Sequence, residues 1–172
     1  MMKQRMSPSI SRIRVRYAET DQMGVVHHAS YLIWMEVARV DYCRQAGFRY
    51  KDLEDDHGVL LAVTEVGCRY LSPARYDDEV EIETVLTRAH HRAVTFKYEM
   101  RAVPSAGEVG DKVRRIASGH TNHMFLNRDL RPTTLPMQFR GMLGIPDGQA
   151  AESGLLVQSA GSEYGTTAKA GD

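Results

Sequence analysis

Cysteine is scarce in this chain: of 172 residues, only Cys43 and Cys68 are cysteines. Two cysteines on separate predicted elements indicate free thiols and exclude a small disulfide-stapled scaffold. Both are therefore expected to be reduced core residues of a cytoplasmic protein.

An excess of charge of one sign is also missing. Lys plus Arg and Asp plus Glu both number 22, so the formal net charge is +0. A nucleic-acid-binding protein needs a basic footprint, and this balance argues against nucleic acid as a partner. It does not exclude a local basic patch.

Long hydrophobic runs are absent as well. No stretch approaches the roughly 20 apolar residues that cross a bilayer, and the first residues lack a signal-peptide core. With 42% hydrophobic and 26% charged residues, the composition is that of a globular protein without membrane insertion. We expect one domain over residues 1–143, followed by a disordered Gly/Ala/Ser/Thr-rich tail over 144–172.

One predicted helix is apolar on nearly every side. Ser30 as N-cap and Gly47 as stop predict a helix over the sequence YLIWMEVARVDYCRQA. Within it, Glu36 and Arg39 stand three residues apart, where they can pair. A helix of this kind must be covered all round. A curled sheet plus a second subunit would cover it, so a homodimer or homotetramer is expected.

Alternating apolar and polar residues predict the strands of that sheet. They are expected over residues 12–17, 59–70, 79–86, 93–103 and 113–126. Consecutive strands with short connections favour antiparallel pairing, and the Gly/Pro-rich segment 104–111 is expected to be a hairpin loop. A short helix is predicted over 137–143. The fold class is therefore α+β, with a five-stranded antiparallel sheet wrapped around one long central helix.

The segment AETDQMGVVHHASYLIWMEVAR, residues 18–39, leads an acid through a turn into this helix. Asp21 and Gly24 occupy the first and fourth positions of a type I turn, where Asp is common for turn formation alone. A helix start offers unpaired N–H groups and the positive end of the helix dipole. These groups can stabilise negative charge on a carbonyl oxygen beside a carboxylate.

The spaced pattern D-x-x-G-x-V-x-H-x-x-Y, from Asp21 to Tyr31, closely resembles the 4-hydroxybenzoyl-CoA thioesterase family of hotdog-fold proteins. It is most similar to the YbgC-like acyl-CoA thioesterases of that family. The similarity resumes at YLSPARYDDEVEIET and fades after about Pro136. The resemblance implies hydrolysis of an acyl- or aroyl-CoA thioester without a metal or other cofactor, by a protein whose minimal unit is a dimer.

The resemblance also implies roles for individual residues. Asp21 matches the catalytic carboxylate, as nucleophile or as general base, and His28 supplies the backbone N–H that polarises the thioester carbonyl. The phosphates of CoA are expected at a hairpin whose matching residues here are Arg88, His90, His91 and Arg92. Because histidine is mostly neutral at pH 7, the two arginines would hold the phosphates. An ordinary polar hairpin tip is the alternative.

Other functions remain open at this point. His120 and His123 stand three apart on a predicted strand and should face opposite sides, so no metal site is expected. A non-catalytic acyl-thioester-binding protein, or a dehydratase or hydratase on the same fold, is the alternative to a thioesterase. The acyl group is not determined, and acyl carrier protein could replace CoA. Glu65 is the acid on strand 59–70 that could substitute for Asp21.

Overall fold

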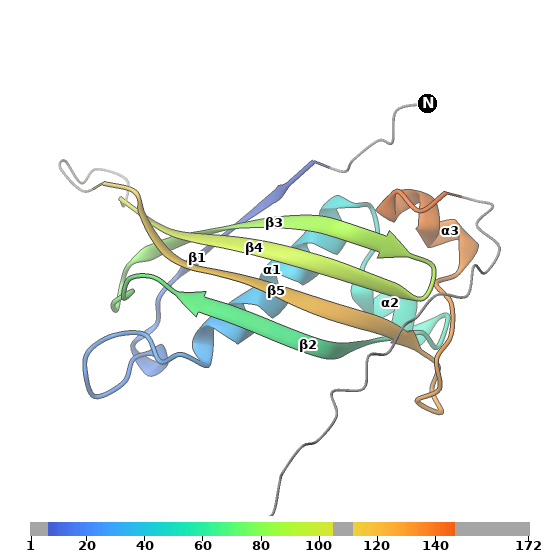
Figure 1. Ribbon diagram of the computed structural model, residues 1–172, viewed down its shortest axis with the longest axis horizontal. Coiled ribbons are helices and arrows are strands. Elements are labelled where there is room, and N and C mark those ends of the chain that lie inside the picture. Colours follow the sequence, from blue (N-terminus) through green and yellow to red (C-terminus); the bar gives the residue numbers. More distant parts are fainter. Residues whose placement is uncertain (1–6, 105–111, 147–172) are drawn as a thin grey trace, which may run out of the picture.

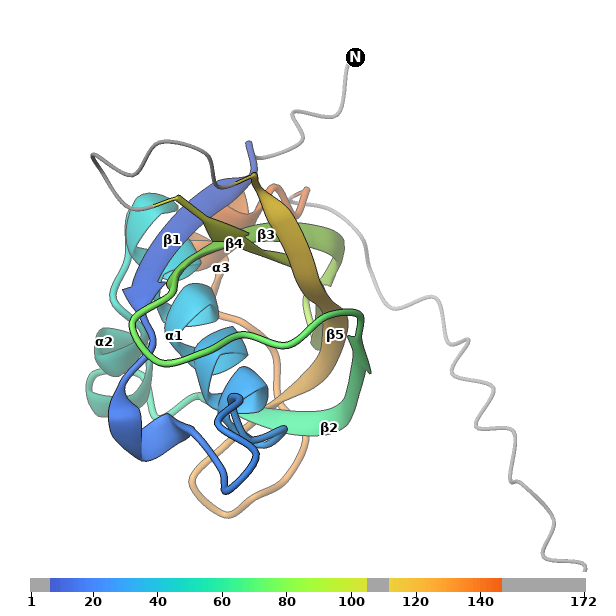
Figure 2. The same ribbon diagram turned by 90° about the vertical axis from the view of Figure 1, so that its left-hand side faces the viewer.

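The computed structural model describes residues 7–104 and 112–146. Its elements are β1 (Ser9–Arg14), the 3₁₀ turn η1 (Tyr17–Glu19), α1 (Ser30–Gln45), α2 (Tyr50–Asp55), β2 (Leu60–Tyr70), β3 (Glu79–His90), β4 (Ala93–Val103), β5 (Arg114–Leu126), α3 (Met137–Arg140) and η2 (Gly141–Leu143). The strands form one sheet in the order β1-β3-β4-β5-β2, with every neighbouring pair antiparallel. The sheet covers α1 from one side and curls around it (Figures 1 and 2).

The predicted α+β architecture is therefore confirmed, with its five antiparallel strands and its central helix. β4 has the predicted bounds, and β2 and β5 each begin one residue later than predicted. α1 has 16 residues, about 24 Å of helix, so it is shorter than strands β2 to β5. The expected loop at 104–111 lies almost wholly outside the described residues, as does the predicted tail beyond Pro146. Ile145 is buried, so the packed core reaches at least that residue.

The first strand lies three residues earlier than predicted. The alternation predicted the correct phase, because Val15 is buried and Ile13 packs against the core. However, Ser9 and Ser11 are also buried, and the Ser11 hydroxyl donates to Asp41 of α1 at 2.9 Å. Small hydroxyl side chains let β1 approach the helix closely. Because they are polar, a pattern of alternating apolar residues does not include them, and the prediction missed the start of the strand.

The predicted end of α1 is confirmed, whereas its predicted N-cap is not. Gly47 follows the helix with φ +103, a conformation that suits glycine, so the predicted stop is confirmed. The predicted N-cap is wrong by one residue: Ala29 takes that position and Ser30 begins the helix. The Ser30 side chain is buried against the Glu19 carbonyl and does not cap the helix.

One side of α1 is not covered by its own chain. Leu32, Ile33 and Val37 are 39%, 54% and 41% exposed. Glu36 on the same side is exposed, and among the described residues it forms no ion pair with Arg39, so that predicted pair is wrong. The opposite side packs on the sheet through Tyr31, Trp34, Met35, Ala38 and Tyr42.

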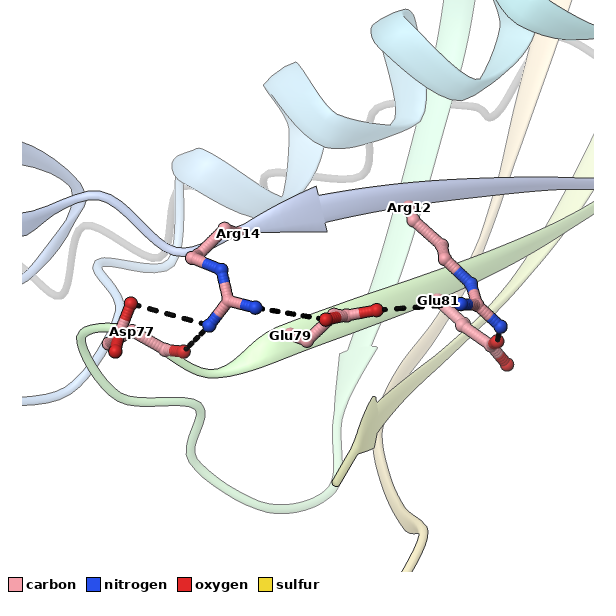
Figure 3. A network of polar contacts seen from close by, with 5 residues as sticks. All are labelled: Arg12, Arg14, Asp77, Glu79 and Glu81. Atoms are coloured by element: carbon pink, nitrogen blue, oxygen red, sulfur yellow. Dashed lines mark hydrogen bonds and ion pairs between the residues drawn. The ribbon is translucent and has the colours of Figure 1, made fainter. Parts of the chain in front are cut away.

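The face of β1 and β3 that points away from α1 is charged. Arg14 contacts Glu79 at 3.0 Å and donates to the carbonyl oxygen of Asp77 at 2.9 Å. Arg12 pairs with Glu81 and lies 3.6 Å from Glu79 (Figure 3). Exposed ion pairs contribute little to stability individually. Their effect here is to keep this face polar, in contrast to the uncovered side of α1.

β5 passes close to α1 at Gly119. A Cβ at this position would overlap the Met35 side chain and stand 2.8 Å from the carbonyl oxygen of Gly67. We expect Gly119→Ala to lower the free energy of unfolding by about 1–3 kcal/mol, since a packed core resists added volume. Urea unfolding measures this, with Gly141→Ala as the control, because no atom lies within 4 Å of the Cβ there. Equal stability of both variants would contradict the close packing.

Candidate active site

Asp21 opens a tight turn that its own side chain closes. Its carbonyl oxygen accepts from the Gly24 N–H at 2.9 Å, and its Oδ1 accepts from the Met23 N–H at 2.8 Å. Gly24 has φ +71, which suits glycine. The predicted turn is therefore confirmed. Asp21 is half-buried, and within the described part of the chain no donor pairs with its Oδ2, so one carboxylate oxygen is left for chemistry.

An unpaired amide lies seven residues after Asp21, at His28, directly before the N-cap of α1. The Ser30 N–H donates to the carbonyl oxygen of His27 at 3.0 Å, and the Leu32 N–H donates to that of Ala29 at 3.1 Å. The His28 N–H has no acceptor among the residues that the structure describes. A carbonyl oxygen placed there would receive this hydrogen bond at the positive end of the helix dipole.

Backbone bonds hold the turn against the helix start. The Asp21 N–H donates to the carbonyl oxygen of Val25 at 2.9 Å, and Thr20 and Val26 form an antiparallel bridge. The Val26 N–H in turn donates to the carbonyl oxygen of Ala74 at 2.8 Å. The chain therefore doubles back within eight residues, so that Asp21 and His28 belong to one closed loop.

Glu19 is a functional candidate that the sequence prediction missed. It is 7% exposed, and its carboxylate accepts from the Arg16 N–H at 2.8 Å and from Trp34 Nε1–H at 2.9 Å. The Arg16 guanidinium contacts it at 2.9 Å. Burial raises the pKa of Glu19, but these hydrogen bonds outweigh burial and hold the pKa below its usual range. The E-x-D spacing of Glu19 and Asp21 was the available sequence signal.

Two further contacts at the helix start involve His27 and Tyr70, to which the sequence prediction gave no role. His27 Nδ1 accepts from the Ala29 N–H at 3.3 Å, and the imidazole lies against that of His28 at 4.1 Å. The Tyr70 hydroxyl donates to the carbonyl oxygen of His28 at 3.0 Å, and its ring packs edge-on against Tyr31. The end of β2 is thereby tied to the residue whose amide is free.

The basic hairpin lies at the other end of the sheet. β3 begins at Glu79, near Ala74 and Arg75, which contact the Asp21 loop, and it ends at His90. The 12 residues of β3 span about 35 Å, and Figure 1 shows the hairpin and the start of α1 at opposite ends. One chain therefore does not bring the predicted phosphate-binding residues together with Asp21.

The hairpin residues also differ from one another. Arg88, His90 and Arg92 are exposed, whereas His91 is buried. The ring of His91 lies 3.9 Å from that of His90, and its carbonyl oxygen accepts from the Leu135 N–H at 2.7 Å. Burial lowers the pKa of His91, which keeps it neutral at pH 7. Arg88 and Arg92 carry permanent positive charge at this hairpin.

The remaining candidates lie elsewhere. Glu65 contacts His120 at 3.3 Å and Asn122 at 2.6 Å on the sheet face away from α1, so it cannot substitute for Asp21. His123 is buried on the opposite face, which confirms the predicted divergence of His120 and His123. Across residues 7–104 and 112–146, no group of three or more His, Cys, Asp or Glu could hold a metal ion. No helix in these two ranges is long and apolar enough to span a membrane.

A sheet curled around one helix, with a carboxylate turn leading into the helix start, defines a hotdog-fold thioesterase. Comparison with known families agrees: residues 15–151 match the thioesterase-like superfamily, and the chain belongs to it. It is therefore a thioester hydrolase.

Individual proteins support this assignment. The chain is 34% identical over 135 residues to YneP of Bacillus subtilis, provisionally named an acyl-CoA thioesterase, covering 78% of this chain and 89% of YneP. It is 37% identical over 84 residues to the acyl-CoA thioester hydrolase YbgC of Escherichia coli, covering 49% of this chain and 62% of YbgC. The structure of the 4-hydroxybenzoyl-CoA thioesterase of Pseudomonas sp. strain CBS-3 has a TM-score of 0.70 at 17% identity, and the match covers 78% of this chain and 98% of that one. At that identity it supports the fold alone.

Proposed function

We propose that this protein hydrolyses an acyl-CoA or aroyl-CoA thioester to the free acid and CoA. The observation that carries the proposal is the closed loop with a free Asp21 Oδ2 at one end and an unpaired His28 N–H at the other. A thioester is already activated, so it needs only a donor for its carbonyl oxygen and a carboxylate at its carbonyl carbon.

The two groups divide the reaction between them. The His28 N–H stabilises the oxyanion that forms as the carbonyl is attacked, and one such donor contributes about 10²–10³ in rate. Asp21 either attacks the carbonyl carbon to form an anhydride, which water then opens, or removes a proton from the attacking water. In both routes water supplies the acid's oxygen, and CoA leaves as the thiolate and is protonated. No metal or cofactor is required.

The test is a thiol-release assay on a panel of acyl-CoAs. The panel contains short, long and aromatic acyl groups, together with the matching acyl carrier protein thioesters. We expect CoA release from at least one member, and kcat/KM across the panel identifies the acyl group and the preferred handle. Hydration of an enoyl-CoA without thiol release would instead favour a hydratase. Tight binding without turnover would favour a non-catalytic carrier.

The cysteines and the net charge bear on where the protein works and on its partners. Cys43 and Cys68 are free thiols, which supports a cytoplasmic location. The charge balance still disfavours nucleic acid as a partner.

We further propose that the active unit is a homodimer or homotetramer. The β3–β4 hairpin and the start of α1, which the Asp21 loop precedes, lie at opposite ends of one chain (Figure 1), so a CoA that contacts both would lie between two subunits.

Within this proposal, Arg88 and Arg92 hold the phosphates of CoA. Both side chains are exposed at the β3–β4 turn, with neutral His91 between them. We expect Arg92→Ala to raise KM for acyl-CoA several-fold while leaving kcat nearly unchanged, and to flatten the salt dependence of KM, because charge-assisted contacts weaken with salt. Arg69→Ala, at an exposed arginine of β2, is the control. If neither Arg88→Ala nor Arg92→Ala changes KM, the hairpin is an ordinary polar turn.

A further inference from the structure

We propose that Glu19 is a positioning residue for the reaction, in that it sets where Asp21 stands relative to the free amide of His28. This inference rests on the proposed thioesterase function. It assigns a task to a buried acid that touches neither the substrate nor the reacting atoms.

The Glu19 side chain joins the segment after β1 to α1 beside the site. Its carboxylate accepts from the backbone N–H of Arg16, which follows β1, and from the guanidinium of the same residue. It also accepts from Trp34 Nε1–H, on the second turn of α1. The bond from Trp34 is buried, so it forms in low dielectric, where a hydrogen bond is strong and directional. The two bonds from Arg16 are part-buried.

The backbone of Glu19 binds the segment at the other end of the same loop. Its carbonyl oxygen accepts from the His27 N–H at 2.8 Å and from the Ser30 hydroxyl at 3.4 Å. Asp21 follows Glu19 by two residues, and His28 follows His27 directly. One residue therefore anchors both ends of the loop on which the carboxylate and the amide are carried.

Stability alone does not account for a carboxylate at this position. Removing a carboxylate from water is costly, and the ion pair with Arg16 offsets little of that cost because the Arg16 side chain is largely exposed. Apolar residues of similar volume often replace buried charged groups without loss of stability. What an apolar pair does not provide is fixed direction, because packing permits shifts that three hydrogen bonds do not. Such shifts matter in an active site, where a displacement of 1 Å can lower the rate about 10²-fold.

The first test uses kinetics. Glu19→Gln keeps the size but places an amide NH₂ beside the Arg16 donors, and Trp34→Phe removes one donor while keeping an aromatic ring beside Tyr31. We expect each variant to lower kcat about 10-fold to 10²-fold with KM little changed. The double variant should lower kcat by less than the product of the two single effects, because both substitutions act on the hydrogen bonds of one carboxylate.

A matched control separates positioning from general destabilisation. Phe139→Leu removes part of a buried aromatic side chain that packs on Phe48 and His57, at the end of the molecule away from the Asp21 loop. It should lower the melting temperature about as much as Glu19→Gln or Trp34→Phe does, while preserving kcat. If Glu19→Gln and Trp34→Phe preserve kcat as this control does, the positioning role is overturned.

A second test does not depend on activity. Trp34 is the only tryptophan, so its fluorescence reports directly on the bond to Glu19. The pKa of Glu19 is lowered in the folded protein, so its contribution to stability is complete above the unfolded-state pKa of about 4.3. That contribution is lost as the pH falls through the lower folded-state pKa. Wild-type emission should therefore shift at a pH below the usual titration range of a glutamate, and Glu19→Gln should lack this shift.

Amide hydrogen exchange completes the design. In Glu19→Gln, the amides of Gly24 and His27 should exchange faster, while that of Tyr98 in β4 should not change. Unchanged exchange at Gly24 and His27 would show that Glu19 does not hold the loop. A wild-type protein that releases no CoA from any substrate overturns the proposed function instead, and fluorescence and exchange then still report on the loop.

Discussion

Asp21→Asn is expected to lower kcat by about 10²–10⁴, the range for loss of a positioned general base. The amide oxygen of asparagine can still accept from the Met23 N–H, so the turn should keep its shape. The amide is neither a base nor a good nucleophile, so the free Oδ2 loses its chemistry whichever route operates. KM and melting temperature should stay near the wild-type values, as measured by thiol release and thermal unfolding.

Asp129→Asn provides the matched control for this experiment. Asp129 likewise stands in a tight turn, where its own N–H donates to Asn127 Oδ1 at 3.0 Å, and its side chain is exposed. The same chemical change there should leave kcat unaltered. Asp21→Ala is a weaker test because it also removes the hydrogen bond that closes the turn. Wild-type kcat in Asp21→Asn would reduce Asp21 to a turn former, and Glu65 could not replace it, because it faces away from α1.

Sequence reasoning located the part of the site that local chemistry determines. The Asp21 turn depends on one side chain, one glycine and a few neighbouring amides, all within five residues. The free amide of His28 lies two residues before Ser30, in the short turn that leads into α1. Neither depends on where the rest of the chain lies.

Contacts between distant segments could not be predicted in this way. Trp34 and Glu19 are 15 residues apart, and the Tyr70 hydroxyl reaches the His28 carbonyl across 42 residues. These pairs are set by how β2 and α1 pack, which a single sequence does not specify. α2 was missed because only Leu53 of its six residues is buried, which is too little for a periodic pattern.

The hairpin shows a different limit. Its residues were found from a resemblance, but their distance from Asp21 depends on the direction and length of β3. That strand continues four residues beyond the predicted end, across a register shift between Leu86 and Arg88. A β-bulge interrupts the alternation by which a strand is recognised, so the prediction stopped at the bulge.

The second large effect concerns the uncovered side of α1. Ile33 and Val37 are exposed there, and Val63 and Val66 of the edge strand β2 are 50% and 40% exposed. Exposed apolar side chains beside an unpaired strand edge favour association, whereas the charged face of β1 and β3 is internally paired. We therefore expect a homodimer or homotetramer that buries the α1 and β2 surface.

An Ile33→Asp and Val37→Asp double variant should dissociate this assembly into monomers, because it places two charges in the apolar contact. Most of the thioesterase activity should be lost with it, because each Asp21 is then separated from the hairpin of the second subunit. Light scattering at micromolar concentration, circular dichroism and thiol release measure the three consequences. Ile10→Asp is the control, since Ile10 is 46% exposed on β1, the other edge of the sheet. It should leave assembly and activity intact. A folded wild-type monomer with full activity, or a dissociated variant that still turns over acyl-CoA, would contradict a site completed by a second subunit.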